Sequence, residues 1–145
     1  MDLLTSLKVS ASGLRANQKR MAAISSNIAN AQTTRTAEGG AYRRKEVVLG
    51  SEPARDSFAD ILEGELSESV QEVHATDVIS ANDAPILKYE PNHPDANAEG
   101  YVAYPNVNVM VEMANMIEAS RAYEANMSAL NTSKQMAMKA LEIGR

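Results

Sequence analysis

The chain has 145 residues and a net charge of −5, and it contains one Phe, no Trp and no Cys. The lack of Cys excludes disulfides, thiolate metal sites and a thiol nucleophile, and the scarcity of large aromatic residues argues against a dense globular interior. Basic residues exceed acidic ones in residues 1–31, whereas acidic residues dominate residues 32–104. An acidic middle argues against nucleic acid as a partner, because nucleic acid requires basic surface.

The first predicted helix covers residues 3–31, which contain no Pro and a single Gly, at position 13. Asp2 is a plausible N-cap, because its carboxylate accepts hydrogen bonds from the free amides of the first turn. Residues at alternating steps of three and four share one face of this helix, as in a coiled-coil seam. The face consists of Leu4, Leu7, Ala11, Leu14, Gln18, Met21, Ser25 and Ile28.

The middle of the chain changes from a helical period to short alternating runs. Residues 50–53 and 91–100 supply turn-forming Gly, Pro, Asn and Asp. Residues 57–60 resemble a capping box before one or two helical turns, but the acidic, Ser-rich stretch 50–69 is also consistent with a loop. Strands are expected at residues 42–49, 73–79, 87–89 and 101–104.

A second long helix is expected after Pro105, with Asn106 or Asn108 as its cap and Gly144 as its terminator. Six of the eight Met residues lie in it, and Met suits an interface because it fills irregular gaps. The same three-and-four spacing defines a face of Val109, Met113, Met116, Ser120, Tyr123, Met127, Leu130, Lys134, Ala137 and Leu141.

These elements predict a mainly α protein with a small β insert, whose long N- and C-terminal helices pair as a coiled-coil-like seam. The expected domains are a discontinuous terminal helical assembly domain, residues 1–34 and 106–145, and a β-rich middle domain, residues 35–105, with a loop at 50–69. A lone amphipathic helix gains little without a partner for its seam, so both faces are expected to serve assembly. The predicted interface comprises Leu4, Leu7, Ala11, Leu14, Met21, Ile24, Ile28, Met113, Met116, Tyr123, Met127, Leu130 and Leu141.

No catalytic, cofactor-binding or metal site is expected from the sequence. His74 and His93 are the only histidines, and their spacing does not form a helical ligand pair. Residues 95–100 resemble the start of an EF-hand loop, but the twelfth position is Asn106 instead of a bidentate Glu. A turn is therefore the better interpretation of that segment.

No stretch reaches the roughly 18 apolar residues that a membrane span needs. The N-terminus also lacks a basic region followed by a continuous apolar block, so no cleavable signal peptide is expected. A chain of this kind that leaves the cytoplasm needs another route.

Residues 12–36 contain the stretch Asn27-Ile-Ala-Asn30-Ala-Gln-Thr33, and this segment resembles the N-terminal signature of the flagellar axial proteins, the rod, hook and hook-associated subunits. Within that family, residues 89–108 and 113–126 look like those of the proximal-rod subunits. The positions that match the family motifs are Asn27, Asn30, Thr33, Pro105 and Asn106.

The resemblance implies a structural protein without catalytic activity or cofactors. Such subunits are exported by the flagellar type III apparatus without signal cleavage and polymerise helically into the rod that crosses the periplasm. The expected partners are other copies of the chain, neighbouring rod subunits and the export apparatus, with no nucleic acid and no small-molecule substrate.

Three alternatives stay open at the level of the sequence. The chain is consistent with another axial subunit, or with a soluble helical-hairpin adaptor that forms a discrete cytoplasmic oligomer. A third alternative is a membrane-surface helix at residues 3–31, although its basic residues are few and no Trp anchors it.

Overall fold

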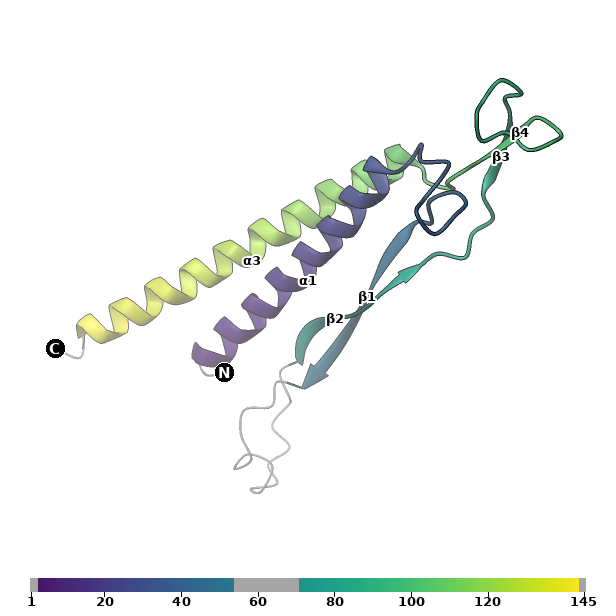
Figure 1. Ribbon diagram of the computed structural model, residues 1–145. Helices are drawn as coiled ribbons and strands as arrows, with labels where there is room; N and C mark the ends of the chain where they lie inside the picture. The colour runs from purple at the N-terminus through teal and green to yellow at the C-terminus, as the bar shows by residue number, and fades with distance from the viewer. Residues whose placement is uncertain (1–2, 54–70, 144–145) are drawn as a thin grey trace. The chain divides into compact units, whose positions relative to one another are not determined.

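The computed structural model describes residues 3–53 and 71–143, and it is mainly helical (Figure 1). The two long elements are α1, Leu3–Ala29, and α3, Val109–Ile143. Short strands lie between them in the sequence, as expected. The predicted fold class, two long terminal helices in contact with small sheets in the middle, is confirmed. Neither helix, over its described residues, is long and apolar enough to cross a bilayer.

The chain divides into two compact units, each of which contains part of both helices. The first unit comprises Met1–Lys19, Leu49–Thr76 and Ala119–Arg145. The second comprises Arg20–Val48 and Asp77–Glu118.

Within each unit, α1 and α3 are in contact. In the first unit a Cβ placed on Gly13 would lie 2.9 Å from Nδ2 of Asn126, so the helix backbone at position 13 comes close to α3. In the second unit Arg20 and Glu118 form an ion pair at 3.4 Å. Small residues allow helices to come close to each other. Three of the four apolar residues buried on the described parts of the two helices are Ala16, Ala23 and Ala119, and the fourth is Ile24.

The start of α3 is capped by Asn108, one of the two residues expected in that role. Its Oδ1 accepts hydrogen bonds from the backbone N–H groups of Met110, at 3.0 Å, and Val111, at 3.4 Å. These bonds satisfy amides that have no partner inside the helix. Asn106 does not serve as the cap, and its side chain is exposed.

The first two-stranded sheet pairs β1, Lys45–Pro53, with β2, Gln71–Ser80. The turn expected at residues 50–53 is wrong, because β1 continues through Pro53. Gly50 instead marks a close approach, since a Cβ there would lie 2.6 Å from Oγ1 of Thr76. The expected capping box at residues 57–60 lies outside the described residues, as does most of the expected loop at 50–69.

The second sheet, in the second unit, is a hairpin of β3, Ile86–Tyr89, and β4, Tyr101–Tyr104. The strands are antiparallel, with Tyr89 opposite Tyr101. Asn97 closes the connection as expected of a turn, because its Oδ1 accepts hydrogen bonds from the backbone N–H groups of Glu99 and Tyr101. Gly100 has a φ of 82°, which Gly adopts readily and L-residues avoid.

Candidate functional site

The most heavily hydrogen-bonded part of the second unit surrounds Asn27, near the end of α1. Only 1% of Asn27 is exposed, and its Nδ2 donates to the carbonyl oxygen of Lys45 at 2.9 Å and to Oε2 of Glu112 at 3.0 Å. Its Oδ1 accepts from the backbone N–H of Lys45 at 2.8 Å and from the hydroxyl of Tyr42 at 3.0 Å. An amide side chain has two donors and an oxygen with two lone pairs, so Asn27 uses its whole capacity.

Glu112 joins the first turn of α3 to this network. Its carboxylate is buried, and its Oε1 accepts from Nε of Arg44 at 2.8 Å. This hydrogen bond raises the pKa of Arg44 above its ordinary value, so the guanidinium remains cationic. A buried charge requires such pairing, and here Arg44 and Asn27 supply it.

The family-motif residues that follow Asn27 shape the end of α1. Asn30 donates through Nδ2 to the carbonyl oxygen of Ser26 at 2.9 Å, and Thr33 donates through Oγ1 to Oδ1 of Asn30 at 3.2 Å. The backbone N–H of Tyr42 then donates to the carbonyl oxygen of Thr33 at 3.1 Å. Because the hydroxyl of Tyr42 donates to Asn27, it accepts from Oγ of Ser26 at 3.0 Å.

We call this network the polar junction; it consists of Ser26, Asn27, Tyr42, Arg44, Lys45 and Glu112. It ties the end of α1, the start of β1 and the first turn of α3 to one another. The side chains of Ser26, Asn27, Tyr42, Arg44 and Glu112 all take part in these contacts, and Lys45 takes part through its backbone. The arrangement is therefore suited to holding segments together. Across residues 3–53 and 71–143, no group of three or more His, Asp or Glu side chains could hold a metal ion.

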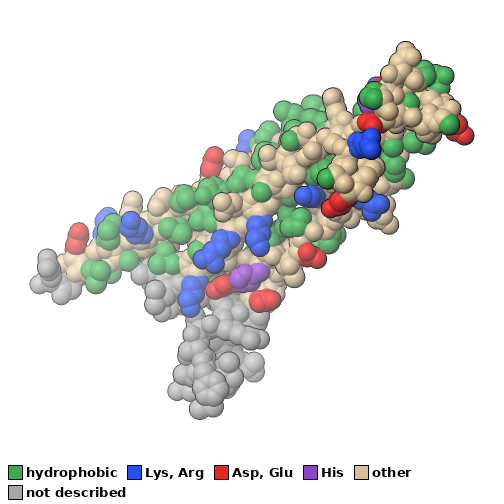
Figure 2. All heavy atoms as spheres, viewed as in Figure 1, with side chains coloured by type: hydrophobic (Ala, Val, Ile, Leu, Met, Phe, Trp, Pro, Cys, Tyr) green, Lys and Arg blue, Asp and Glu red, His purple; other side chains and the backbone are tan. Residues whose placement is uncertain are grey.

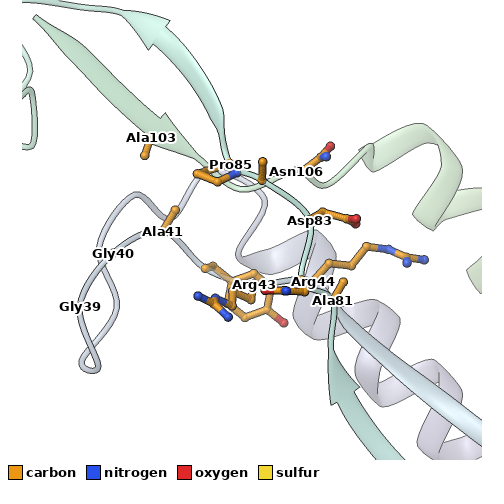
Figure 3. Close-up of a pocket in the computed structure, with 13 residues that line it drawn as sticks. Gly39, Gly40, Ala41, Arg43, Arg44, Ala81, Asp83, Pro85, Ala103 and Asn106 are labelled. Carbon is orange, nitrogen blue, oxygen red and sulfur yellow. The ribbon is translucent and has the colours of Figure 1, made fainter.

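A pocket of about 350 Å³ lies beside the polar junction (Figure 3). It is lined by residues 39–44 and 81–85, with Ala103 and Asn106 completing the wall. Within this lining, the carboxylate of Asp83 is the only acidic group, and Arg44 is already bound to Glu112. The lining holds no pair of catalytic groups, so the pocket is assigned no chemistry.

The residues of α1 predicted to form the assembly interface are partly covered by the chain itself. Gln18 and Ser25, the polar members of the predicted face, are exposed. The side chain of Leu4 is outside the described part of the structure. Ile24 is buried, whereas Leu7, Ala11, Leu14, Met21 and Ile28 are half-buried.

The predicted interface residues of α3 are more exposed than those of α1. Met116, Tyr123 and Leu130 are half-buried, whereas Met113 is 51% exposed and Leu141 is 76% exposed. Hydrophobic side chains are visible on the molecular surface in Figure 2. The exposed large apolar residues of α3 are Val109, Met110, Val111, Met113, Ile117, Met127, Met136, Met138 and Leu141.

Comparison with known proteins decides which family this architecture belongs to. The model of the flagella basal body rod protein matches residues 7–35, and that of the flagellar basal body rod FlgEFG protein C-terminal region matches residues 98–143. The flagellar basal-body rod protein FlgC of Bacillus subtilis is 45% identical over the full length of both chains. The FlgC proteins of Borreliella burgdorferi and Salmonella typhimurium are 39% and 38% identical, and at least 98% of each chain is covered.

The chain belongs to the FlgC family of flagellar basal-body rod proteins. The expected membership of the flagellar axial proteins is therefore confirmed. FlgC-family chains are structural subunits of the rod, not enzymes. The family-model match at residues 7–35 includes Asn27, Asn30 and Thr33, and the match at residues 98–143 includes Glu112.

Most of the polar junction escaped prediction from sequence. The sequence identifies Asn27 only as a motif position, and its motifs do not single out Glu112 for a site. The sequence pattern predicts a strand that includes Tyr42 and Arg44, but β1 begins at Lys45. The available signal was the position of a lone carboxylate in an apolar stretch, since Glu112 is flanked by Val111 and Met113.

Proposed function

We propose that this FlgC-family chain is a proximal-rod subunit that polymerises helically with its own copies and neighbouring rod subunits through α1 and α3. In this proposal the rod crosses the periplasm, and the flagellar type III apparatus exports the chain without removing a leader. The family membership supports a place in the rod. The single observation that supports α3 as an assembly surface is its exposed apolar face.

The apolar face of α3 in the second unit consists of Met110, Met113 and Ile117, which are 75%, 51% and 56% exposed. Their spacing of three and four residues places them on one side of the helix. Removing apolar surface from water contributes about 25 cal/mol for each Å² buried. Covering this face in an assembly would therefore stabilise the assembled state, whereas the separate chain leaves it in water.

The assembly proposal is tested by placing a charge on the face. Met113→Asp should abolish rod formation, because a carboxylate would have to be buried between subunits. Its effect on the folded chain should be small, since the side chain of Met113 is half exposed. Electron microscopy of basal bodies and swimming assays would measure the effect in a strain that lacks its own copy of the subunit.

The control adds the same charge away from the helices, by Asn92→Asp, at an exposed position in the hairpin connection. This variant should form rods and support swimming. Normal rods with Met113→Asp would contradict the proposed use of α3. Mass spectrometry of the exported chain would test the export route, and a shortened N-terminus would contradict export without cleavage.

A further inference from the structure

Few apolar side chains of α1 are buried in the second unit. The buried apolar residues of α1 there are Ala23 and Ile24. Burial of apolar surface is non-directional, so two buried side chains define the register of α3 against α1 less sharply than hydrogen bonds do. The exposed ion pair of Arg20 and Glu118 joins the same helices but adds little.

The polar junction has the directionality that the apolar contacts lack. A shift of one residue along an α-helix moves a side chain by about 1.5 Å and turns it by about 100°. The contacts of Glu112 with Arg44 and Asn27 measure 2.8 and 3.0 Å. Such bonds weaken steeply with distance and misalignment, so a shift of one residue would break both.

The same junction is a poor source of net folding stability. Taking a carboxylate and a guanidinium out of water offsets much of their attraction, and apolar replacements of similar volume are often neutral or stabilising. Glu112 is 1% exposed, so its carboxylate loses almost all of its contact with water. The pair of Glu112 and Arg44 is therefore better suited to selecting one arrangement of the helices than to raising the free energy of unfolding.

We propose that Glu112 and Arg44 are positioning residues for rod assembly, which lock α3 to α1 and β1 in one register. Glu112 lies in the same turn as Met110 and Met113, so its contacts fix the direction in which that part of the apolar face points. Every copy then presents the same face to its neighbours. This inference rests on the proposed function, because it assigns the face of α3 to assembly.

The test replaces the buried pair with apolar side chains of similar length, Arg44→Met together with Glu112→Met. Asn27 keeps its two contacts with the backbone of Lys45 and its contact with Tyr42 in this variant, and one N–H of its amide loses its partner Glu112. We expect the midpoint of urea unfolding, followed by circular dichroism of the purified chain, to stay close to that of wild type, because the ion pair no longer has to be desolvated and this offsets the unpaired N–H. Electron microscopy and swimming assays should show that rods are lost.

The matched control is Arg20→Gln together with Glu118→Gln, which removes the solvent-exposed pair between the same two helices. It should leave rods and swimming unchanged, because exposed ion pairs add little. Met113→Asp, measured in the same strain, reports on the proposed function alone. If Met113→Asp abolishes rods but the buried double variant forms them normally, the positioning role is wrong and the proposed function stands.

A second outcome would also overturn the positioning role. If the buried double variant loses rods together with a matching fall in its unfolding midpoint, or fails to fold, the pair is an ordinary stabilising contact. If Met113→Asp forms normal rods, the proposed use of α3 fails, and the positioning role fails with it.

Discussion

Asn27 is suited to the polar junction because a single short side chain carries both donors and acceptors. Its amide bonds both the N–H and the C=O of Lys45, in the manner of a neighbouring β-strand, and it still reaches Glu112 and Tyr42. An aliphatic residue would remove the partner that Asn27 gives to both backbone groups of Lys45, and would take one contact each from Glu112 and Tyr42. A carboxylate would supply acceptors where donors are needed.

Asn27→Asp is therefore expected to lower the free energy of unfolding by about 2–4 kcal/mol, since an unpaired buried polar group costs about 1–3 kcal/mol. Two acceptors lose their donor, the carbonyl oxygen of Lys45 and Oε2 of Glu112. Urea unfolding at neutral pH measures the change. The matched control is Asn30→Asp, which loses one hydrogen bond to Ser26 at a half-exposed site and should cost about 1 kcal/mol. Equal losses for the two variants would contradict this account of Asn27.

Glu90 gives the hairpin of β3 and β4 a dependence on pH. Nζ of Lys88 donates to its Oε1 at 2.7 Å, and the hydroxyl of Tyr104 donates to its Oε2 at 2.9 Å. The hydrogen bond from Lys88, followed by that from Tyr104, lowers the pKa of Glu90 below its ordinary value of 4.5. A depressed pKa in the folded state means that the ionised group contributes stability above the ordinary pKa, and that this contribution is lost as pH falls through the folded value.

Acidification from neutral pH through the region below 4.5 should therefore loosen the hairpin. Glu90→Gln should remove this dependence, so that the variant is less stable than wild type at neutral pH and similar to it at the acidic end. The chemical shifts of the Tyr101 and Tyr104 amides across a pH titration would measure the change. Glu99→Gln, at an exposed position in the same hairpin, should titrate like wild type. A Glu90→Gln hairpin that still loosens over the same acidic range would show that another group is responsible.

At the scale of the elements, the approach of α1 to α3 in the first unit depends on Gly13. Gly in a helix interior costs about 1 kcal/mol relative to Ala, but a methyl group at position 13 would lie 2.9 Å from Nδ2 and 3.2 Å from Cγ of Asn126. Propensity and packing therefore oppose each other at this position. The absence of a side chain is what admits the Asn126 amide.

Gly13→Ala should stabilise the Asn126→Ala variant by about 1 kcal/mol, the full difference in helix propensity. In the wild-type background the gain should be smaller, because the amide of Asn126 must move. A double-mutant cycle of urea unfolding measures this coupling. The same gain in both backgrounds would mean that Asn126 does not restrict position 13.

The elements themselves were largely predictable from sequence, whereas their contacts were not. The long three-and-four periods and Asn108 located both helices, and the alternation around Tyr101 located β4. The sequence pattern favours large residues such as Leu14 and Met21 as the seam, because they bury the most area. In the structure these two are half-buried, while Ala16 and Ala23 are buried. Close packing between helices favours small residues, and a pattern of hydrophobicity does not record that preference.

The polar junction was beyond prediction for a different reason. Its members are far apart in sequence, and Asn27 and Glu112 are separated by 85 positions. No local period links them to Arg44 or to the backbone of Lys45. The contacts arise only when α1, β1 and α3 come together. A single sequence therefore does not show which of these residues contact one another.

For the whole molecule, the proposed assembly predicts that some segments of the separate chain resist opening while others open readily before rods form. In the second unit, the N–H of Lys45 is bonded to the buried side chain of Asn27. In the first unit, Met136, Met138 and Leu141 of α3 are 63%, 49% and 76% exposed. A helix end that buries little apolar surface opens at low free energy.

Hydrogen exchange should therefore be fast for the amides of residues 131–143 in dilute monomer and slow in assembled rods, where neighbouring copies cover the apolar side chains. The N–H of Lys45 is the internal control, and its exchange should be slow in both states. Mass spectrometry of peptides from a verified monomer and from purified rods measures both segments in one experiment. Full protection of residues 131–143 in the monomer would mean that the separate chain already holds this end in place. No gain in protection on assembly would mean that these side chains are not covered by neighbouring copies, and either result would contradict the use of this end of α3 as an assembly surface.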